Sequence, residues 1–197
     1  MEQDLPIYEL TISDADEGNF EVDYIALVDR PAIQRNFQAF RDQIEVMLAV
    51  HDKAQRIVSG ALMIPDRLIL RRDDGGEYWI KFTADTIKQI AIRFAKQGYQ
   101  RNVNLQHDKD QRIEAVLFES WLKDAERGIG GMKGYEDLPD GTWFGSMKIT
   151  DDAGWNKVEA GEVRGFSVEG IFQYERAAKT KDDEIMNKII DILQGAN

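Results

Sequence analysis

The sequence contains no cysteine and only two histidines among its 197 residues. Without cysteine there is no disulfide bond, no thiolate nucleophile and no thiolate metal site. Any chemistry that needs an imidazole must therefore use His51 or His107, and a metal site built from two or three histidines is nearly excluded. We predict that the protein uses no cofactor.

Long apolar runs are also missing. The longest, such as the one within residues 45–50, are far shorter than the roughly 20 apolar residues that a membrane-spanning helix needs, so we expect no membrane partner. The chain begins Met-Glu-Gln-Asp, without a basic segment leading into an apolar one, and we expect it to work in the cytoplasm where it is made. The net charge of −11 argues against a nucleic-acid partner, because clustered Lys and Arg side chains hold phosphate backbones.

Residue patterning predicts many short strands and few helices. Residues 85–97 show the clearest helical periodicity, with Thr83 or Asp85 as the cap and Gly98 at the end. A short helix is expected after Asp151 or Asp152. Because helices do not alternate regularly with strands, we predict an α+β fold: a mostly antiparallel β-barrel of about seven strands, flanked by helices.

Changes in composition along the chain predict three parts. Residues 1–42 form an N-terminal arm with two strands and, over 31–42, a short helix or docked segment. Residues 43–175 form the barrel domain. Residues 176–197 form a polar linker and a C-terminal amphipathic helix over 182–194.

His107 is the first candidate for chemistry. The pattern of 103–107 predicts a strand that ends at this histidine, just before a polar turn over 108–111, so the imidazole is well placed to face a cleft. The plain alternative is a surface histidine hydrogen-bonded to Asp108. A metal site from His107, Asp108 and Asp110 is a third possibility. This spacing occurs in any acidic turn, however, and no other feature of the sequence supports a metal site there. We read His51, which ends a strand at another polar turn, as a turn residue.

Ser167 is the second candidate, and it lies in a predicted strand between Gly165 and Gly170. Glycines in a strand often mark a place where another backbone or a ligand approaches closely. A serine nucleophile needs such room, together with free backbone N–H groups for the oxyanion. The alternative is an ordinary serine in a bulged strand, and the local pattern alone is a weak signal.

Glu119 is the third candidate. In a strand over 113–122, Glu119 shares a face with apolar side chains. If that face is buried, the carboxylate of Glu119 needs a partner, and His107 would supply one. If the opposite face is buried, Glu119 is solvated, and the pattern leaves both readings open. Asp108, Glu114 and Glu169 are also candidate acids.

Several stretches together resemble the prohead proteases of tailed phages, and most closely the phage serine protease family typified by the prophage protein XkdF. They span residues 22–170 in the family's order. The stretches are Val22 to Ala32, Arg56 to Gly60, Val103 to Asp108, Trp143 to Lys148 and Gly165 to Gly170.

The resemblance implies a herpesvirus-assemblin-like barrel and a serine endopeptidase inside the phage procapsid in the host cytoplasm. Its expected substrates are extensions of the major capsid and scaffold proteins, and the chain itself. By position, the resemblance assigns Ser167 as nucleophile and His107 as base, with Glu119 as the acid; we expect the backbone N–H of Val168 at the oxyanion. The alternative is a non-enzymatic scaffold, cargo or structural protein of the phage head. The sequence leaves the oligomeric state open, a homo-oligomer included.

Overall fold

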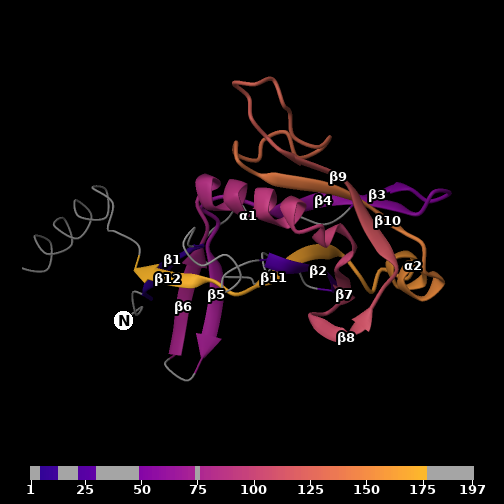
Figure 1. The fold of residues 1–197 in the computed structure, drawn as a ribbon, viewed down its shortest axis with the longest axis horizontal. Helices are drawn as coiled ribbons and strands as arrows, with labels where there is room; N and C mark the ends of the chain where they lie inside the picture. The colour runs from indigo at the N-terminus through magenta and orange to yellow at the C-terminus, as the bar shows by residue number, and fades with distance from the viewer. Residues whose placement is uncertain (1–4, 13–21, 30–48, 74–75, 177–197) are drawn as a thin grey trace, which may run out of the picture.

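The computed structural model describes residues 5–12, 22–29, 49–73 and 76–176, which form twelve strands and two α-helices (Figure 1). In chain order the elements are β1 (Ile7–Thr11), β2 (Val22–Val28), β3 (Ala49–Asp52), β4 (Ile57–Met63), β5 (Ile69–Asp73), β6 (Gly76–Lys81), α1 (Ala84–Lys96), the 3-10 helix η2 (Tyr99–Arg101), β7 (Val103–Leu105), β8 (Asp108–Arg112), β9 (Ala115–Leu122), β10 (Trp143–Ile149), α2 (Asp152–Glu159), β11 (Gly165–Gly170) and β12 (Gln173–Arg176).

The strands pair into three four-stranded sheets, in the orders β12-β1-β6-β5, β3-β4-β10-β9 and β11-β2-β7-β8. The pairs β1–β6 and β2–β7 are parallel and the others are antiparallel. The predicted α+β class is confirmed. The predicted closed barrel is not found, because the strand pairing among the described residues ends at sheet edges instead of returning to the first strand.

Two of the strands beyond the predicted number of about seven have a physical explanation. β5 and β8 each lie at the edge of a sheet and carry several charged residues. Edge strands tolerate charge because one side of each faces solvent, and charge there discourages pairing with other chains. The sequence pattern predicted a polar turn over 108–111, where β8 lies.

The two helices begin where the sequence predicts. Thr83 accepts a hydrogen bond from the Thr86 N–H at the start of α1, and Gly98 follows the helix with φ +75°. Asp151 caps α2 by accepting from two backbone N–H groups, and Gly161 follows that helix with φ +70°. Each helix is thus bounded by a side-chain acceptor and a left-handed glycine, as the local patterns require.

The core lies where α1 meets the sheets. Phe94 of α1 packs edge-to-face on Trp143 of β10, with 5.6 Å between ring centroids, and both are almost fully buried. β10 also pairs closely with β4, where the buried hydroxyls of Ser59 and Ser146 are 2.9 Å apart. Two of the family-like stretches therefore pair with each other and build the core.

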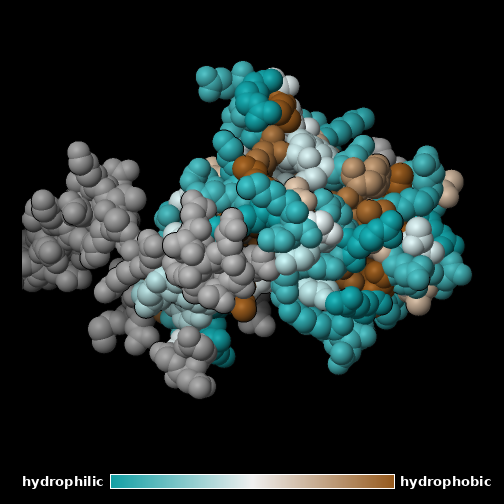
Figure 2. All heavy atoms as spheres, in the orientation of Figure 1, coloured by the Kyte–Doolittle hydropathy of each residue, from teal (hydrophilic) through white to brown (hydrophobic). Residues whose placement is uncertain are grey.

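The segment 1–42, predicted as an arm, contributes strands to two sheets. β1 lies between β12 and β6, and β2 lies between β11 and β7. The predicted helices over 31–42 and 182–194 lie outside the described residues. Figure 2 shows hydrophilic residues over most of the described surface in that view, in keeping with a chain that is 31% charged. Within the described ranges, no helix combines the length and apolar character needed to span a membrane.

Candidate active site

Ser167 lies in the middle of β11, directly opposite Ala26 of β2, which is in turn opposite Asn104 of β7. Residues opposite each other in a sheet share a face, so these three side chains form a row across the strands. Glu169 is two residues after Ser167 and points to the same face. Ser167 is 6% exposed and Asn104 is fully buried. This row therefore contains two buried polar side chains, Ser167 and Asn104.

His107 lies in the two-residue turn between β7 and β8, not before a turn over 108–111 as predicted. Gln106 and His107 have φ of 53° and 62°, which is the left-handed pair of a type I′ hairpin turn. Residues other than glycine adopt this conformation at a cost, and such strain is typical of functional sites.

The His107 turn is held by the end of β2. The Gln106 N–H donates to the Leu27 carbonyl oxygen at 3.0 Å, and the Asp29 N–H lies 3.3 Å from Gln106 Oε1, to which it donates. Both contacts come from Leu27 and Asp29, within the stretch Val22 to Ala32 that supports the family resemblance. This stretch therefore holds the turn that carries the imidazole.

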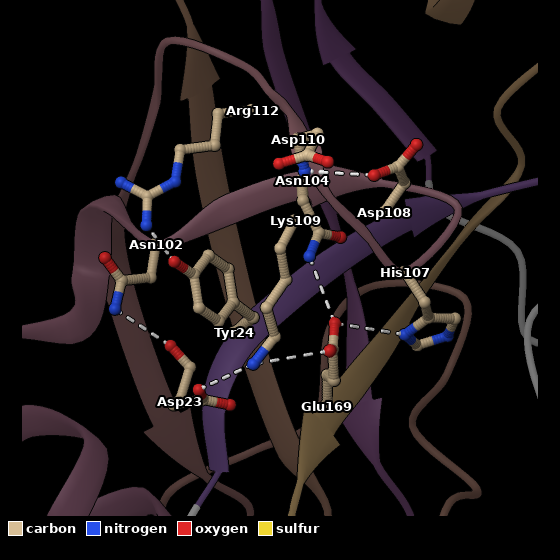
Figure 3. A network of polar contacts seen from close by, with 10 residues as sticks. All are labelled: Asp23, Tyr24, Asn102, Asn104, His107, Asp108, Lys109, Asp110, Arg112 and Glu169. Carbon is tan, nitrogen blue, oxygen red and sulfur yellow. Dashed lines mark hydrogen bonds and ion pairs between the residues drawn. The ribbon is translucent and has the colours of Figure 1, made fainter.

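Glu169 is the carboxylate beside His107 (Figure 3). His107 Nδ1 is 3.6 Å from Glu169 Oε2, an ion-pair distance somewhat longer than a hydrogen bond. The same oxygen accepts a hydrogen bond of 3.0 Å from Asn104 Nδ2. Asn104 Oδ1 is buried and has no hydrogen-bond partner among the described residues. A buried amide with one unsatisfied atom is costly, and here it holds the carboxylate in place.

Lys109 approaches Glu169 from the other side. Its ammonium group is 3.6 Å from Glu169 Oε1 and donates to Asp23 Oδ2 at 3.1 Å. It also lies 4.9 Å from the centroid of the Tyr24 ring. The hydrogen bond to Asp23, helped by the charges of Asp23 and Glu169, raises the pKa of Lys109 above its ordinary value of 10.5. The carboxylate next to His107 is therefore flanked by a permanent positive charge.

Glu119 lies elsewhere, exposed on β9 in the sheet β3-β4-β10-β9. The pairing with β10 shifts between Leu117 and Glu119, so that Phe118 is an extra residue in a β-bulge. The bulge breaks the simple alternation that predicted Glu119 on the same face as Leu117, which is buried. Glu169, also a candidate acid from the sequence, is the carboxylate in contact with His107, and period-2 alternation from Ser167 is the signal that identifies it.

The two remaining candidate acids, Glu114 and Asp108, lie at the surface of the molecule. Glu114 is exposed. Asp108 accepts hydrogen bonds from the Gln111 side chain and the Asp110 N–H, and these bonds lower its pKa. The described residues contain no group of three or more His, Asp or Glu side chains arranged to hold a metal ion. His51 lies in β3, and its side chain is outside the described part of the structure.

A cavity of about 220 Å³ brings Ser167 and His107 together, although they are 60 positions apart in the chain. Glu169 lines it as well. Among the described residues, Ser167 Oγ and the imidazole form no direct hydrogen bond. Catalytic hydrogen bonds are often long in proteins without substrate and shorten when substrate binds, so the arrangement is compatible with a nucleophile and its base.

The cavity follows the free edge of β11. The Ile25 N–H donates to Asn102 O, and the Leu27 carbonyl accepts from Gln106 N, so these backbone groups of β2 face β7. Backbone groups alternate along a strand, so those of Ala26 face β11 and those of Ser167 face β2. The N–H and C=O of Val168 therefore point to the opposite edge of β11, where no strand pairs among the described residues.

Comparison with curated proteins and with solved structures finds no match to this chain. A protein-family model, described as "Putative phage serine protease XkdF", matches residues 43–175, about two-thirds of the chain. The matched residues include β11 with Ser167 and Glu169, and the turn that carries His107. The chain belongs to this phage serine protease family.

Proposed function

We propose that this protein is a serine endopeptidase in which Ser167 is the nucleophile, His107 the general base and Glu169 the acid that orients His107. One observation carries the proposal: a buried serine, an imidazole and a carboxylate, supplied by a strand and a distant turn, line one cavity. The strained backbone at His107 and the buried Asn104 bond to Glu169 support it, because both hold the groups in place at a cost in stability.

The proposed reaction follows from the two nitrogens of the imidazole. Nδ1 faces Glu169, which leaves Nε2 for Ser167. Ser167 Oγ attacks the peptide carbonyl carbon while Nε2 accepts the hydroxyl proton, and the Glu169 carboxylate stabilises the imidazolium. The proton then passes to the leaving amine as the C–N bond breaks. Water, deprotonated by His107, hydrolyses the acyl-enzyme and regenerates Ser167.

The Val168 N–H is the proposed oxyanion donor. It belongs to the residue after the nucleophile and points to the open edge of β11, where a substrate carbonyl has access. A peptide that adds to this edge as an extended strand is held by backbone hydrogen bonds, a common mode of peptide recognition. Removal of one oxyanion donor typically costs about 10²–10³ in rate.

The proposed biological substrates are extensions of the phage capsid and scaffold proteins, cut during head maturation inside the procapsid. Membership of a phage serine protease family supports this proposal. The high negative charge supports it too, because an acidic protein binds weakly to the nucleic acid that surrounds phage assembly.

Co-expression with the cognate capsid and scaffold proteins tests the proposal, with mass spectrometry of the products. We expect defined cleavage by the native chain, none by Ser167→Ala, and unchanged cleavage by the control Ser120→Ala, at an exposed position of β9. Ser120 accepts a hydrogen bond from the buried indole of Trp143, so this control removes a structural contact without touching the cavity. Thermal unfolding verifies that both variants are folded. Undiminished cleavage by Ser167→Ala overturns the proposal.

A second measurement separates the enzyme from a non-enzymatic head protein. A fluorophosphonate probe reacts with an activated serine without any knowledge of the substrate. We expect labelling of Ser167 alone. A native chain that is folded, resists the probe and leaves the capsid and scaffold proteins intact is a structural head component instead.

A further inference from the structure

The cavity beside Ser167 has an apolar interior that the catalytic groups do not explain. Its volume of about 220 Å³ is below the range of about 300–1,000 Å³ typical of small-molecule sites, but exceeds the roughly 150 Å³ that suffices for a benzene-sized group. It therefore has the size for one large side chain. All three sheets contribute apolar lining residues, which are Leu10, Leu62, Met63, Ile64, Ile69, Ile80, Phe82, Phe166 and Phe172.

Polarity changes from the interior of the cavity to its rim. Leu10, Leu62 and Ile80 are each only 2% exposed, so the deep wall is part of the hydrophobic core. The polar lining residues away from the catalytic groups, Arg71 and Tyr174, are both exposed. Arg71 also donates a hydrogen bond to its neighbour's carbonyl at 3.4 Å. A charged group that enters the deep part loses its hydration without gaining a partner there.

The cavity lies along the edge of β11. Five consecutive residues of β11, Phe166 to Gly170, line it. Successive side chains point to opposite faces, so a cavity touched by all five runs along the edge of the strand. A peptide bound to that edge with its carbonyl at Ser167 projects a neighbouring side chain into the apolar interior.

We propose that this cavity is the specificity pocket of the enzyme, and that it selects substrates with a bulky apolar residue, such as Leu, Ile, Met or Phe, beside the scissile bond. The inference rests on the proposed protease function and adds the substrate class. Ile69 is the specificity-determining residue that is easiest to vary. It is only partly buried, on β5 opposite Ile80, and it packs against the core at the cavity wall.

The first arm of the test is a cleavage profile. The full chain is incubated with a peptide library derived from a bacterial proteome, and cleavage sites are mapped by mass spectrometry. We expect one position beside the cut to be enriched in bulky apolar residues, with kcat/KM falling at least about tenfold for each methylene removed. Ile69→Trp, which fills the cavity, shifts the profile to Ala and Gly, and Ile69→Ala broadens it to larger aromatic residues.

Leu70→Ala is the matched control. Leu70 is the next residue on β5, points to the opposite face and does not line the cavity. We expect its cleavage profile to equal that of the native chain. A profile without apolar enrichment, or one that Ile69 substitutions leave unchanged, overturns the pocket assignment while the protease function stands.

The second arm needs no catalysis. Ligand-detected NMR compares toluene with benzoate, which has a similar ring but carries a charge. We expect the native chain, Ser167→Ala and Leu70→Ala to bind toluene and not benzoate, and Ile69→Trp to bind neither. One outcome separates the two proposals: toluene binds in this pattern, but the chain neither cleaves peptides nor reacts with the fluorophosphonate probe. The protease function is then overturned, while the selectivity of the cavity for apolar groups stands. If toluene does not bind, the selectivity fails.

Discussion

Replacing Glu169 with glutamine removes the negative charge that faces His107 and keeps the size of the side chain. The imidazolium that forms during the proposed reaction then loses a carboxylate 3.6 Å away. Coulomb's law with an effective dielectric constant of about 20 gives roughly 4.6 kcal/mol for this pair, and with the dielectric constant of water roughly 1.2 kcal/mol. Because the His107 side chain is 42% exposed, the loss should lie between these limits.

At about 1.4 kcal/mol for each factor of ten, Glu169→Gln should slow the reaction of Ser167 by about 7-fold to about 2,000-fold. The assay is the second-order rate of fluorophosphonate labelling, which requires no knowledge of the substrate. Glu119→Gln is the matched control and should change the rate by less than about twofold, since Glu119 is exposed on another sheet. A large loss in Glu119→Gln with an unaffected Glu169→Gln would refute the assignment of the acid.

Three further predictions concern stability, each measured by chemical denaturation. His107→Gly should be more stable than His107→Ala by about 1–2 kcal/mol, because φ is +62° there and only glycine adopts that angle freely; equal stabilities would contradict the turn geometry. Gly145→Ala should cost about 1–3 kcal/mol, because its Cβ would lie 2.5 Å from Leu117 Cδ1, whereas Gly130→Ala, with open space around it, should be neutral. Lys109 has a raised pKa, so its contribution to stability is complete below 10.5 and disappears only as the pH rises through the still higher folded value. The stability difference between native protein and Lys109→Met should therefore be constant from about pH 6 to about pH 9, and a difference that disappears within that range would argue against the Asp23 contact.

Features with a local cause were predictable from sequence. The start and end of α1 follow from Thr83, the spacing of its apolar residues and Gly98, all within one segment. The candidate residues Ser167 and His107 were identified from glycines around a serine, from the scarcity of histidine and from the family resemblance. The turn was predicted to begin at residue 108 but begins two residues earlier, at Gln106. The sequence did not indicate this, because Gln106 and His107 lack the Asn-Gly signature of a type I′ turn.

The identity of the acid depended on features that are not local. Predicting Glu119 assumed unbroken alternation along β9, and the bulge at Phe118, which arises in the pairing with β10, ends that alternation. Asn104 and Lys109 could not be associated with Glu169 beforehand, since their contacts require β7 and β8 to join the sheet of β2 and β11.

The amino-acid sequence by itself determined the α+β class, the helix ends, the absence of thiol chemistry and the two residues proposed for nucleophile and base. The first three follow from short-range periodicity, capping and composition, and the two residues were assigned through the family resemblance. Only the tertiary structure decided that the sheets stay open, that Glu169 faces His107, and that an apolar cavity adjoins Ser167. Strand order, register and bulges are set by packing between distant segments, and local residue preferences do not encode them.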